Sequence, residues 1–405
     1  MPAMPDFAYL FERFPSFTQT FCYREVLEMR RQCGQIPVFS IRRPADVPKD
    51  CPEPLASDVR YLPGPADLGR EMRTLRMLGR YPWPVIQEIR TWGKRPGKAR
   101  LLEAAWLGPK LRAEGVRHVH AHFAGIAART AWWMKKFYGI TFSFTGHAND
   151  MFCESGSPVS LGDLVSEAAF VVAVSDFSRD WLCRRMPGHD AKIHRIYNGM
   201  DFSGFPVPAA SSGPPRIVSI GRCIEKKGFA DLIDACGILR QKNLDFECEI
   251  IGGGPLEADL RARIAALGLQ NWVGLHGPCP QEEVRQRLAA ATLFALPCAT
   301  EPDGGMDTLP TVIVEAMAAE LPVVSTRLAA IPEMVEHGVT GLLVGEKQPA
   351  QLAEAMAEIL RNPEQARRFG RAGKLVAGGK FASQPTVASL KELLIQFSGA
   401  ASPPV

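Results

Sequence analysis

The chain has 405 residues, of which 46% are hydrophobic and 22% are charged. It is therefore long enough for two or three domains, and its composition excludes an intrinsically disordered chain. The net charge of +4 is too small to indicate a nucleic-acid-binding protein. The positive charge is local, because residues 60–117 hold 13 basic and 5 acidic side chains. Such a block predicts a surface for an anionic lipid or acidic substrate, or merely a solvated charged face.

The ten cysteines show neither C-x-x-C spacing nor a zinc-binding pattern with histidine. They are typical of reduced thiols packed in a cytoplasmic protein. The first residues lack a basic segment followed by an apolar one, so no signal peptide is predicted. Uncharged runs such as 137–149 are shorter than the ~18 residues that a membrane span needs. We expect any membrane contact to be peripheral, on the cytoplasmic face.

Hydrophobic periodicity predicts strands that alternate with helices along both halves of the chain. In the first half we expect strands at 7–10, 38–41, 116–120, 141–144 and 170–174. We expect helices there at 18–31 and, interrupted by prolines and a glycine, across 60–113. In the second half the expected strands are 216–220, 246–251, 272–275, 293–296, 323–325 and 342–344. The expected helices of that half are one ending at 267 and those at 229–240, 281–290, 309–319, 331–337 and 381–397.

This alternation predicts an α/β protein with two doubly wound, Rossmann-like domains. A stretch rich in Pro, Ser and Ala at 205–215 is typical of a linker. We therefore expect a first domain at 1–205, a second at 206–380, and a C-terminal helix and tail at 381–405 that packs back toward the first domain. Two such domains would face a cleft, and ligands of parallel sheets bind beyond the carboxyl ends of the strands.

Two glycine-containing turns follow the first two strands of the second half. Gly221 and Arg222 come directly after a predicted strand, and Lys227 follows five residues later, at the start of a helix. Two cations on such a turn suit a diphosphate, with the alternative of a solvent-exposed charged turn. Gly253 and Gly254 lie at the next crossing, where glycine allows close approach of backbone to a ligand or simply a tight turn.

Two carboxylates, Asp307 and Glu315, stand eight residues apart in a glycine-rich loop and the helix after it. They can project toward the same end of the sheet. Glu315 lies among apolar residues, so it occupies a narrow solvent-facing stripe or is partly buried and needs hydrogen-bond donors. Sugar and ribose hydroxyls are suitable donors.

Histidines gather at two places in the first half. His118, His120 and His122 alternate, so on a strand they would share one face. One interpretation is a metal site, and the other is that these histidines pack in the core or line the cleft. The second is favoured, because no carboxylate and histidine further along the chain complete a set of metal ligands. His147 follows a predicted strand and has Asp150 close by in the same loop. It is a candidate for the cleft.

Together these motifs resemble the family-4 retaining glycosyltransferases of GT-B fold, over most of the chain. The resemblance is carried by Gly221-Arg222 with Lys227-Gly228, by Asp307 through Glu315, and by the segments 197–201 and 331–344. In the first half, residues 14–21, HAHF and FTGHAND resemble the branch that makes exopolysaccharides such as colanic acid and amylovoran. Asp307 departs from the family pattern, which usually has glutamate there, and Thr18-Gln19 replaces the Ser-Glu common in that branch.

The resemblance implies transfer of a sugar, with retention, from a nucleoside diphosphate sugar (UDP- or GDP-sugar) to a saccharide or lipid-linked saccharide acceptor. It implies catalytic roles for His147, Asp307 and Glu315, with Asp307 on the transferred sugar and Glu315 also on the ribose. The remaining implied donor-binding residues are Gly221, Arg222, Lys227, Gly253, Gly254, Thr308 and Leu309. No metal and no cofactor is expected, because Arg222 and Lys227 carry out the charge stabilisation that Mg²⁺ provides elsewhere.

Three other functions stay open at this point. The same fold could serve a phosphorylase or a nucleotide-sugar epimerase. A metal-dependent hydrolase could use His118, His120 and His122. A non-catalytic sensor would bind a nucleotide sugar without cleaving it.

Overall fold

The computed structural model describes residues 6–16, 19–45, 47–48, 51–79, 83–92, 95–152, 156–205 and 213–399. Thr18 and the central part of the predicted linker, 206–212, lie outside the described residues. The chain forms two compact units. The first contains the chain up to Val174, Arg179–Gly199 and the C-terminal segment from Ser383, and the second contains Ser175–Ser178 and Met200–Ala382.

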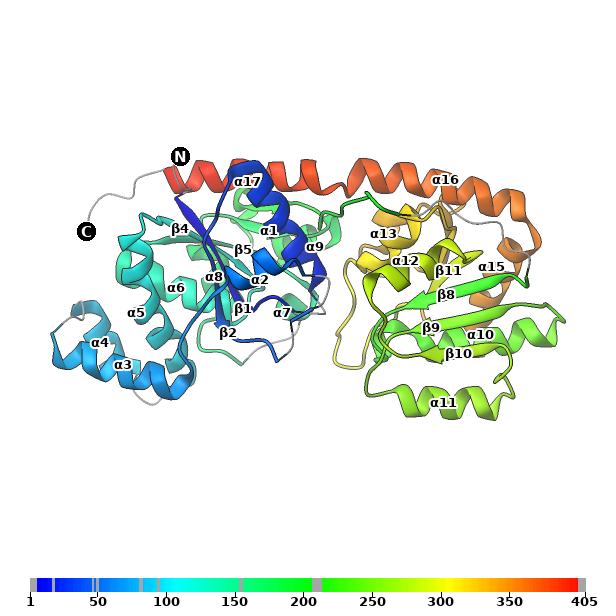
Figure 1. The fold of residues 1–405 in the computed structure, drawn as a ribbon, viewed down its shortest axis with the longest axis horizontal. Helices are drawn as coiled ribbons and strands as arrows, with labels where there is room; N and C mark the ends of the chain where they lie inside the picture. Colours follow the sequence, from blue (N-terminus) through cyan, green and yellow to red (C-terminus); the bar gives the residue numbers. More distant parts are fainter. Residues whose placement is uncertain are drawn as a thin grey trace. The chain divides into compact units, whose positions relative to one another are not determined.

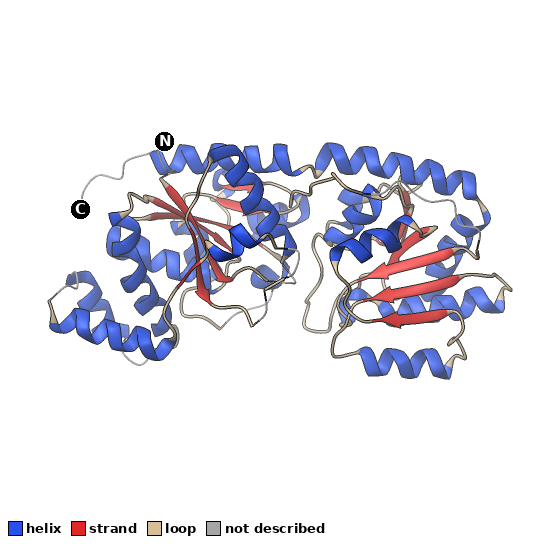
Figure 2. Ribbon diagram, in the orientation of Figure 1, coloured by secondary structure: helices blue, strands red, loops and turns tan. Residues whose placement is uncertain are grey.

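The first unit is built on a sheet of seven strands in the order β3-β2-β1-β4-β5-β6-β7 (Figures 1 and 2). Its strands are β1 (Phe7–Arg13), β2 (Val38–Arg42), β3 (Arg60–Tyr61), β4 (His118–His122), β5 (Thr141–Gly146), β6 (Val171–Ala173) and β7 (Ile193–Arg195). Every neighbouring pair is parallel. The chain order reverses between β1 and β4, which is the switch point where open α/β sheets bind ligands.

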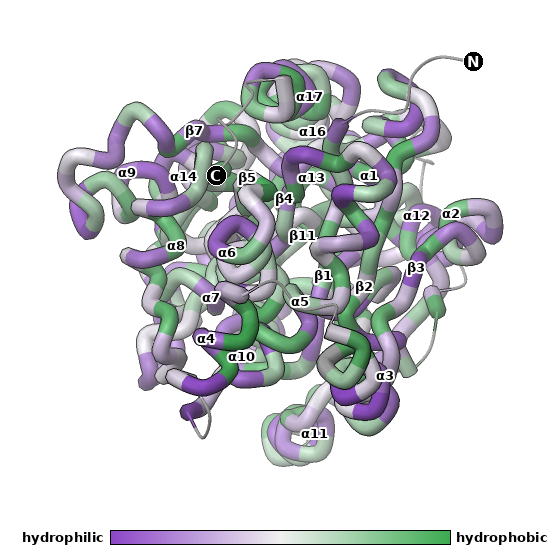
Figure 3. Tube along the Cα trace, turned by 90° about the vertical axis from the view of Figure 1, so that its left-hand side faces the viewer, coloured by the Kyte–Doolittle hydropathy of each residue, from purple (hydrophilic) through white to green (hydrophobic). Residues whose placement is uncertain are grey.

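Both faces of this sheet are buried, because alternate residues of a strand point to opposite sides. On β1, Ala8 and Leu10 belong to one apolar cluster, whereas Tyr9 and Phe11 belong to another. Figure 3 shows the corresponding hydrophobic stretch along β1. Helices α5 (Lys98–Ala113) and α6 (Ile126–Tyr138) contribute to the first cluster, and α1 (Thr20–Cys33) and α17 (Ser383–Gly399) to the second. The other helices of this unit are α2 (Glu53–Ser57), α3 (Pro65–Met77), α4 (Trp83–Trp92), α7 (Ala148–Phe152), α8 (Leu161–Glu167), α9 (Asp176–Arg185) and the 3-10 turn η1 (Asp190–Lys192).

The second unit has a six-stranded parallel sheet in the order β10-β9-β8-β11-β12-β13. Its strands are β8 (Arg216–Ile220), β9 (Glu247–Ile251), β10 (Val273–His276), β11 (Leu293–Leu296), β12 (Val323–Thr326) and β13 (Gly341–Val344). Its helices are η2 (Glu225–Lys227), α10 (Phe229–Gln241), α11 (Glu257–Ala266), α12 (Gln281–Ala289), α13 (Thr311–Ala318), α14 (Ile331–Met334), α15 (Pro349–Arg361) and α16 (Pro363–Lys380). The switch point of this sheet lies between β8 and β11.

The predicted α/β class is confirmed, and most predicted elements are present with shifted ends. The strand predicted at 116–120 begins two residues later, at His118. The reason is the end of α5: Gly115 adopts a left-handed conformation (φ 79°), and the backbone N–H of Val116 donates to the carbonyl of Leu111 at 2.9 Å. These residues close a helix terminus instead of joining the sheet.

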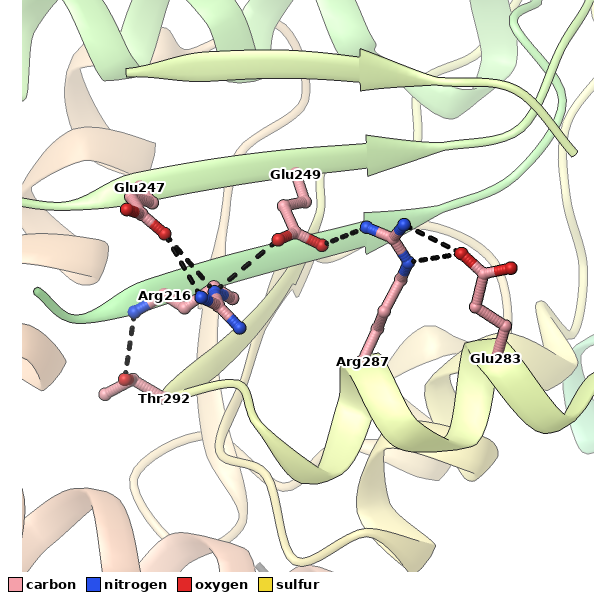
Figure 4. A network of polar contacts seen from close by, with 6 residues as sticks. All are labelled: Arg216, Glu247, Glu249, Glu283, Arg287 and Thr292. Carbon is pink, nitrogen blue, oxygen red and sulfur yellow. Dashed lines mark hydrogen bonds and ion pairs between the residues drawn. The ribbon is translucent and has the colours of Figure 1, made fainter. Parts of the chain in front are cut away.

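Charged side chains link one part of the second sheet to α12 (Figure 4). Arg216 of β8 lies 3.3 Å from Glu247 and 3.5 Å from Glu249, both on β9. Arg287 of α12 then joins Glu249 at 2.7 Å to Glu283 at 2.8 Å. These side chains are partly or fully exposed, so solvent screens the pairs and each contributes little to stability. The network's position, between strand starts and a helix surface, indicates a structural role.

Among the described residues, no helix is both long enough and apolar enough to cross a membrane. The cysteines of the described part of the chain are all free thiols, most of them buried.

Candidate active site

The turn after β8 lies at the switch point of the second sheet, as predicted for Gly221, Arg222 and Lys227. Gly221 directly follows β8 and donates its backbone N–H to the carbonyl of Ile251 at 3.0 Å. Arg222 is exposed to solvent, and Lys227 ends the short helix η2. The carboxyl end of β8 thus presents one exposed guanidinium and one partly buried ammonium.

Of the two predicted glycine positions, close backbone approach between neighbouring turns explains Gly254 but not Gly253, and it also explains Gly252. A side chain at Gly252 would collide with the carbonyl oxygen of Gly221. A Cβ atom at Gly254 would lie 2.7 Å from the carbonyl oxygen of Cys223, whereas one at Gly253 would make only ordinary contacts with Pro278 at 3.4 Å. Glycine is therefore required at Gly252 and Gly254 for packing of the turns, and Gly253 is the position with space beside it.

Asp307 is an ion-pair partner of the lysines in the turn after β8. Its Oδ2 lies 2.5 Å from Nζ of Lys227, and its Oδ1 lies 3.9 Å from Nζ of Lys226. Burial lowers the pKa of Lys227, but attraction to Asp307 outweighs it, so the pKa lies above its ordinary value. Lys226 is 3% exposed, and sequence reasoning missed it because only one lysine of the pair fitted the predicted spacing. The cluster of Lys226, Lys227 and Asp307 thus has two positively charged side chains and one negatively charged side chain.

Glu315 is buried on α13, with 4% of the residue exposed. Its Oε2 accepts a hydrogen bond from Nε2 of Gln281 at 3.2 Å. Of the two alternatives left by the sequence, the structure therefore selects the buried carboxylate. Thr308 and Leu309, just before α13, are also buried, at 4% and 8% exposure.

In the first unit, the alternating histidines of β4 all point to the face of the sheet that α1 and α17 cover. His118, His120 and His122 are each 0% exposed. His118 lies 2.7 Å and His120 lies 2.8 Å from the hydroxyl of Ser143 on β5. The second nitrogen of His118 is 2.8 Å from the hydroxyl of Thr141. Burial lowers the pKa of His118 to about 3, and that of His120 also lies well below its ordinary value.

His122 differs from the other two because it meets a carboxylate. Its Nε2 lies 3.0 Å from Oε1 of Glu25 on α1, and its Nδ1 lies 3.4 Å from Nε2 of His147 and 3.6 Å from the sulfur of Cys22. Burial alone would lower the pKa of His122, but Cys22 and Glu25 raise it to about 10. Burial also raises the pKa of the Cys22 thiol.

His147 is held in place by its backbone and by two aromatic rings. Asp150 accepts the backbone N–H of His147 at 3.0 Å and also that of Ala124, so it braces this loop and does not face the imidazole. The rings of Phe21 and Phe123 have centroids 4.8 and 4.4 Å from that of His147. Phe123 has a left-handed backbone (φ 69°), a strained conformation of a kind that concentrates at functional sites. Burial and the charge of His122 hold the pKa of His147 well below its ordinary value.

The three alternating histidines do not come together as one set of possible metal ligands. Within the described part of the chain, the one group of possible ligands close enough together is Glu25, His120 and His122, with ligand atoms within 4.8 Å. His118 is not part of it. Both nitrogens of His120 and of His122 already have hydrogen-bond partners within the unit. The geometry therefore favours a hydrogen-bonded network.

Glu25 is the functional candidate that the sequence analysis missed in this unit. It lies 97 residues from His122 along the chain. The only local indication of its role in the sequence was that a carboxylate lies on the face of α1 that also carries buried apolar side chains.

Comparisons with known proteins agree with this architecture. Residues 48–203 match the glycosyltransferase family 4 domain, and residues 205–376 match the domain of glycosyl transferases group 1. A glycosyltransferase of amylovoran biosynthesis from Erwinia amylovora is 46% identical over 36% of this chain and 35% of its own length. A glycosyltransferase of Escherichia coli K12, named for colanic acid biosynthesis, is 40% identical over 38% of each chain. The crystal structure of Anabaena HepE with UDP superposes with a TM-score of 0.69 at 18% identity, over 96% of this chain and all of that one.

Two Rossmann-like units that superpose on such a structure define the GT-B fold. The chain therefore contains a glycosyltransferase family 4 domain and a domain of glycosyl transferases group 1, in agreement with the resemblance of its motifs. The segments matched to the two bacterial relatives span little more than a third of their lengths.

Proposed function

We propose that this protein transfers a sugar from a nucleoside diphosphate sugar to a saccharide or lipid-linked saccharide acceptor in exopolysaccharide biosynthesis. One observation carries the proposal. The turn after β8 brings Lys226 and Lys227 to the acidic residue that opens the family's carboxylate pair, at the switch point of the second sheet. The relatives in amylovoran and colanic acid biosynthesis support the acceptor class, and the UDP in Anabaena HepE supports the donor class.

Arg222 and Lys227 bind the diphosphate in this proposal. Arg222 is exposed and can bind two oxygens, whereas Lys227 is a fixed point charge. Gly221 and Gly253 let backbone approach the nucleotide, and the tight turn at Gly254 holds their two loops together. These cations stabilise the charge that develops on the leaving diphosphate, so the reaction requires neither a metal ion nor a cofactor.

The carboxylates and the backbone before α13 bind the rest of the donor. Glu315 accepts hydrogen bonds from the ribose, and Thr308 and Leu309 line the position beside it. Asp307 accepts hydrogen bonds from the transferred sugar once the diphosphate shares Lys227. Asp307 contacts Lys227 in this structure. Because aspartate is one methylene shorter than glutamate, Asp307 must move or share that contact to reach a sugar.

His147 acts on the transferred sugar from the first unit. The acceptor attacks from the face that the leaving diphosphate occupies, and the phosphate takes the acceptor's proton. The bond to the leaving oxygen breaks as the bond to the acceptor oxygen forms on the same face, which gives retention. A neutral imidazole suits this role because it can donate one hydrogen bond without competing for the diphosphate.

The basic block supports peripheral attachment to an anionic membrane on the cytoplasmic side, where a lipid-linked acceptor would lie. Helices α3 and α4 expose Met77, Leu78 and Trp83, with 81%, 60% and 67% of each residue accessible. Of the tryptophans in the block, Trp92 packs against Trp133, and Trp106 donates to Glu71. Trp83 is therefore the tryptophan available to a membrane interface.

The experiment is a thermal-shift panel of UDP-, GDP- and ADP-sugars, followed by product analysis with the best donor. Binding to the native state raises the unfolding temperature, by an amount that grows with the logarithm of the ligand excess over Kd. The expected result is one strongly stabilising base and an α-linked product from an α-linked donor, in the presence of a chelator. Consumption of free phosphate, epimerised donor without acceptor, or binding without turnover would each contradict the proposal.

A further inference from the structure

The proposed function leaves open which nitrogen of His147 carries the proton, and the contacts of His147 bear on that question. A neutral imidazole has one N–H donor and one acceptor nitrogen, and the partner of one nitrogen decides the role of the other. Nε2 of His147 faces Nδ1 of His122 at 3.4 Å, and the two rings are nearly parallel, with an interplanar angle of 18°. A hydrogen bond between these two nitrogens needs one of them to carry a proton and the other to accept it.

Glu25 decides which of the two histidines holds that proton. A carboxylate only accepts hydrogen bonds, so Nε2 of His122 must donate to Oε1 of Glu25 across the 3.0 Å contact. The pair is buried, since His122 is 0% exposed and the Glu25 side chain is 16% exposed. A carboxylate within about 4–6 Å of a histidine favours the charged form of the imidazole. His122 is therefore an imidazolium, and its Nδ1 is also a donor.

We propose that Glu25 and His122 are positioning residues that hold His147 as the tautomer with a proton on Nδ1 and an acceptor at Nε2. This inference rests on the proposed role of His147. In the part of the chain that the structure describes, Nδ1 of His147 has no hydrogen-bond partner, and 7% of the residue is exposed. The Nδ1–H is thus the donor left for a substrate hydroxyl.

The elevated pKa of His122, about 10, and the depressed pKa of His147 agree with this proton arrangement. Other groups around His122 do not reverse it. Tyr9 donates its hydroxyl to the same Oε1 of Glu25 at 2.9 Å, which leaves the carboxylate negative. The titratable groups that face His122 come from β1, α1, β4 and the loop after β5, and they are Tyr9, Cys22, Glu25, His120 and His147.

The tautomer can be measured without any substrate. In full-length protein labelled with ¹⁵N-histidine, long-range ¹H–¹⁵N spectra distinguish protonated from unprotonated ring nitrogens, and His147→Gln assigns the signals. The wild-type spectrum is expected to show His122 protonated on both nitrogens and His147 protonated only on Nδ1. In Glu25→Gln, the amide oxygen still accepts from Nε2 of His122 but carries no charge. His122 then becomes neutral, its Nδ1 becomes an acceptor, and the proton of His147 moves to Nε2.

Turnover is the second readout. Loss of the tautomer in Glu25→Gln is expected to lower kcat by about 10–100-fold, the range for removing a group that orients a histidine. The KM for the donor should stay within about threefold, because the proposed diphosphate residues belong to the other unit. Glu28→Gln is the matched control, since Glu28 lies one turn along α1 and pairs with Arg31 instead of a histidine. It is expected to leave both the spectrum and the turnover unchanged.

The outcomes separate this inference from the proposed function. Wild-type His147 protonated on Nε2, or an unchanged spectrum in Glu25→Gln, would overturn the inference whatever the activity. A shifted proton with unchanged kcat would show that the tautomer does not serve catalysis, and would also overturn it. Normal turnover of His147→Gln would instead contradict the role of His147 in the proposed function.

Discussion

Nζ of Lys227 lies 2.5 Å from Oδ2 of Asp307, so the predicted phosphate-binding lysine and the predicted sugar-binding carboxylate are direct partners. Both groups are buried in the same turn region, with side-chain exposures of 13% and 17%. In the proposed function, a bound diphosphate would share or take over the ammonium of Lys227, which would free Asp307 for a sugar. Removing Lys227 would leave the Asp307 carboxylate without its nearest positive charge, which destabilises a buried pair.

Arg222 is a better residue than Lys227 for testing the proposed diphosphate site, because it is exposed and its removal does not disrupt the ion pair with Asp307. Arg222→Ala should lower kcat/KM by about 30-fold or more, the effect of losing a charge-assisted contact to the leaving group. Lys227→Ala should lower it at least as far and should also lower the unfolding temperature. Lys242→Ala, at an exposed pair with Glu354 beyond α10, is the control and should behave as wild type. Turnover of Arg222→Ala within about threefold of wild type would show that the turn is wrongly assigned.

Glu315→Gln keeps the shape of the side chain and its contact with Gln281 but removes the acceptor charge. Affinity for the donor and for the free nucleoside diphosphate should both fall, while the fold survives. Calorimetry of nucleotide binding measures this. The control is Glu320→Gln, because Glu320 follows the same helix and pairs with Lys374 at the surface. If wild type and Glu315→Gln bound the nucleoside diphosphate with equal affinity, Glu315 would not be a ribose-binding residue.

His147→Ala should leave nucleotide binding nearly intact, because the proposed diphosphate residues belong to the second unit. Turnover should fall by ~10²-fold or more, as expected for a positioned polar group at the reacting centre. His118→Ala should have a smaller effect, since His118 bonds to Ser143 and Thr141 within the sheet. A normal rate for His147→Ala, with an inactive His118→Ala that has lost a bound metal, would favour the hydrolase alternative.

The basic block should attach the protein to anionic vesicles in a reversible, salt-sensitive way. Each basic residue near such a surface contributes ~1 kcal/mol at most, and salt screens it within ~8–10 Å. Trp83→Ser should weaken flotation with phosphatidylserine-containing vesicles. Leu375→Ser is the matched control, because Leu375 is an equally exposed apolar residue (79%) on α16 of the other unit. Absence of flotation at low salt would show that the basic block is only a solvated surface and does not bind membranes.

The pairing of His122 should make the first unit lose stability as pH rises. The folded pKa of about 10 lies above the ordinary 6.5, so the folded state binds the proton more tightly than the unfolded state. The stabilisation is complete below about pH 6.5 and disappears as pH rises through about 10. In a Trp272→Phe background, all six remaining tryptophans lie in the first unit and report its urea unfolding. The difference in unfolding midpoint between that background and its Glu25→Gln variant should shrink from pH 6.5 to pH 10. A constant difference would contradict the pairing.

The sequence alone was sufficient for the six strands of the second sheet, for five of the seven strands of the first sheet, and for the turn after β8, whereas the short edge strands β3 and β7 were missed. Strand and helix periodicity is a local property, and the glycines and cations of that turn lie within a few residues of one another. The family resemblance rested on the same kind of short-range order, which is why residues such as Gly221, Lys227 and Glu315 could be named before any coordinates were known.

Only the tertiary structure decided the partners of these residues. Lys227 and Asp307 are 80 positions apart, and Glu25 and His122 are 97 positions apart, so no local pattern connects them. The three histidines of β4 look equivalent in the sequence, yet two face hydroxyls of β5 and the third faces a carboxylate from α1. Which of them carries a charge depends on burial and on the neighbour across the sheet face, and the folded chain alone provides both.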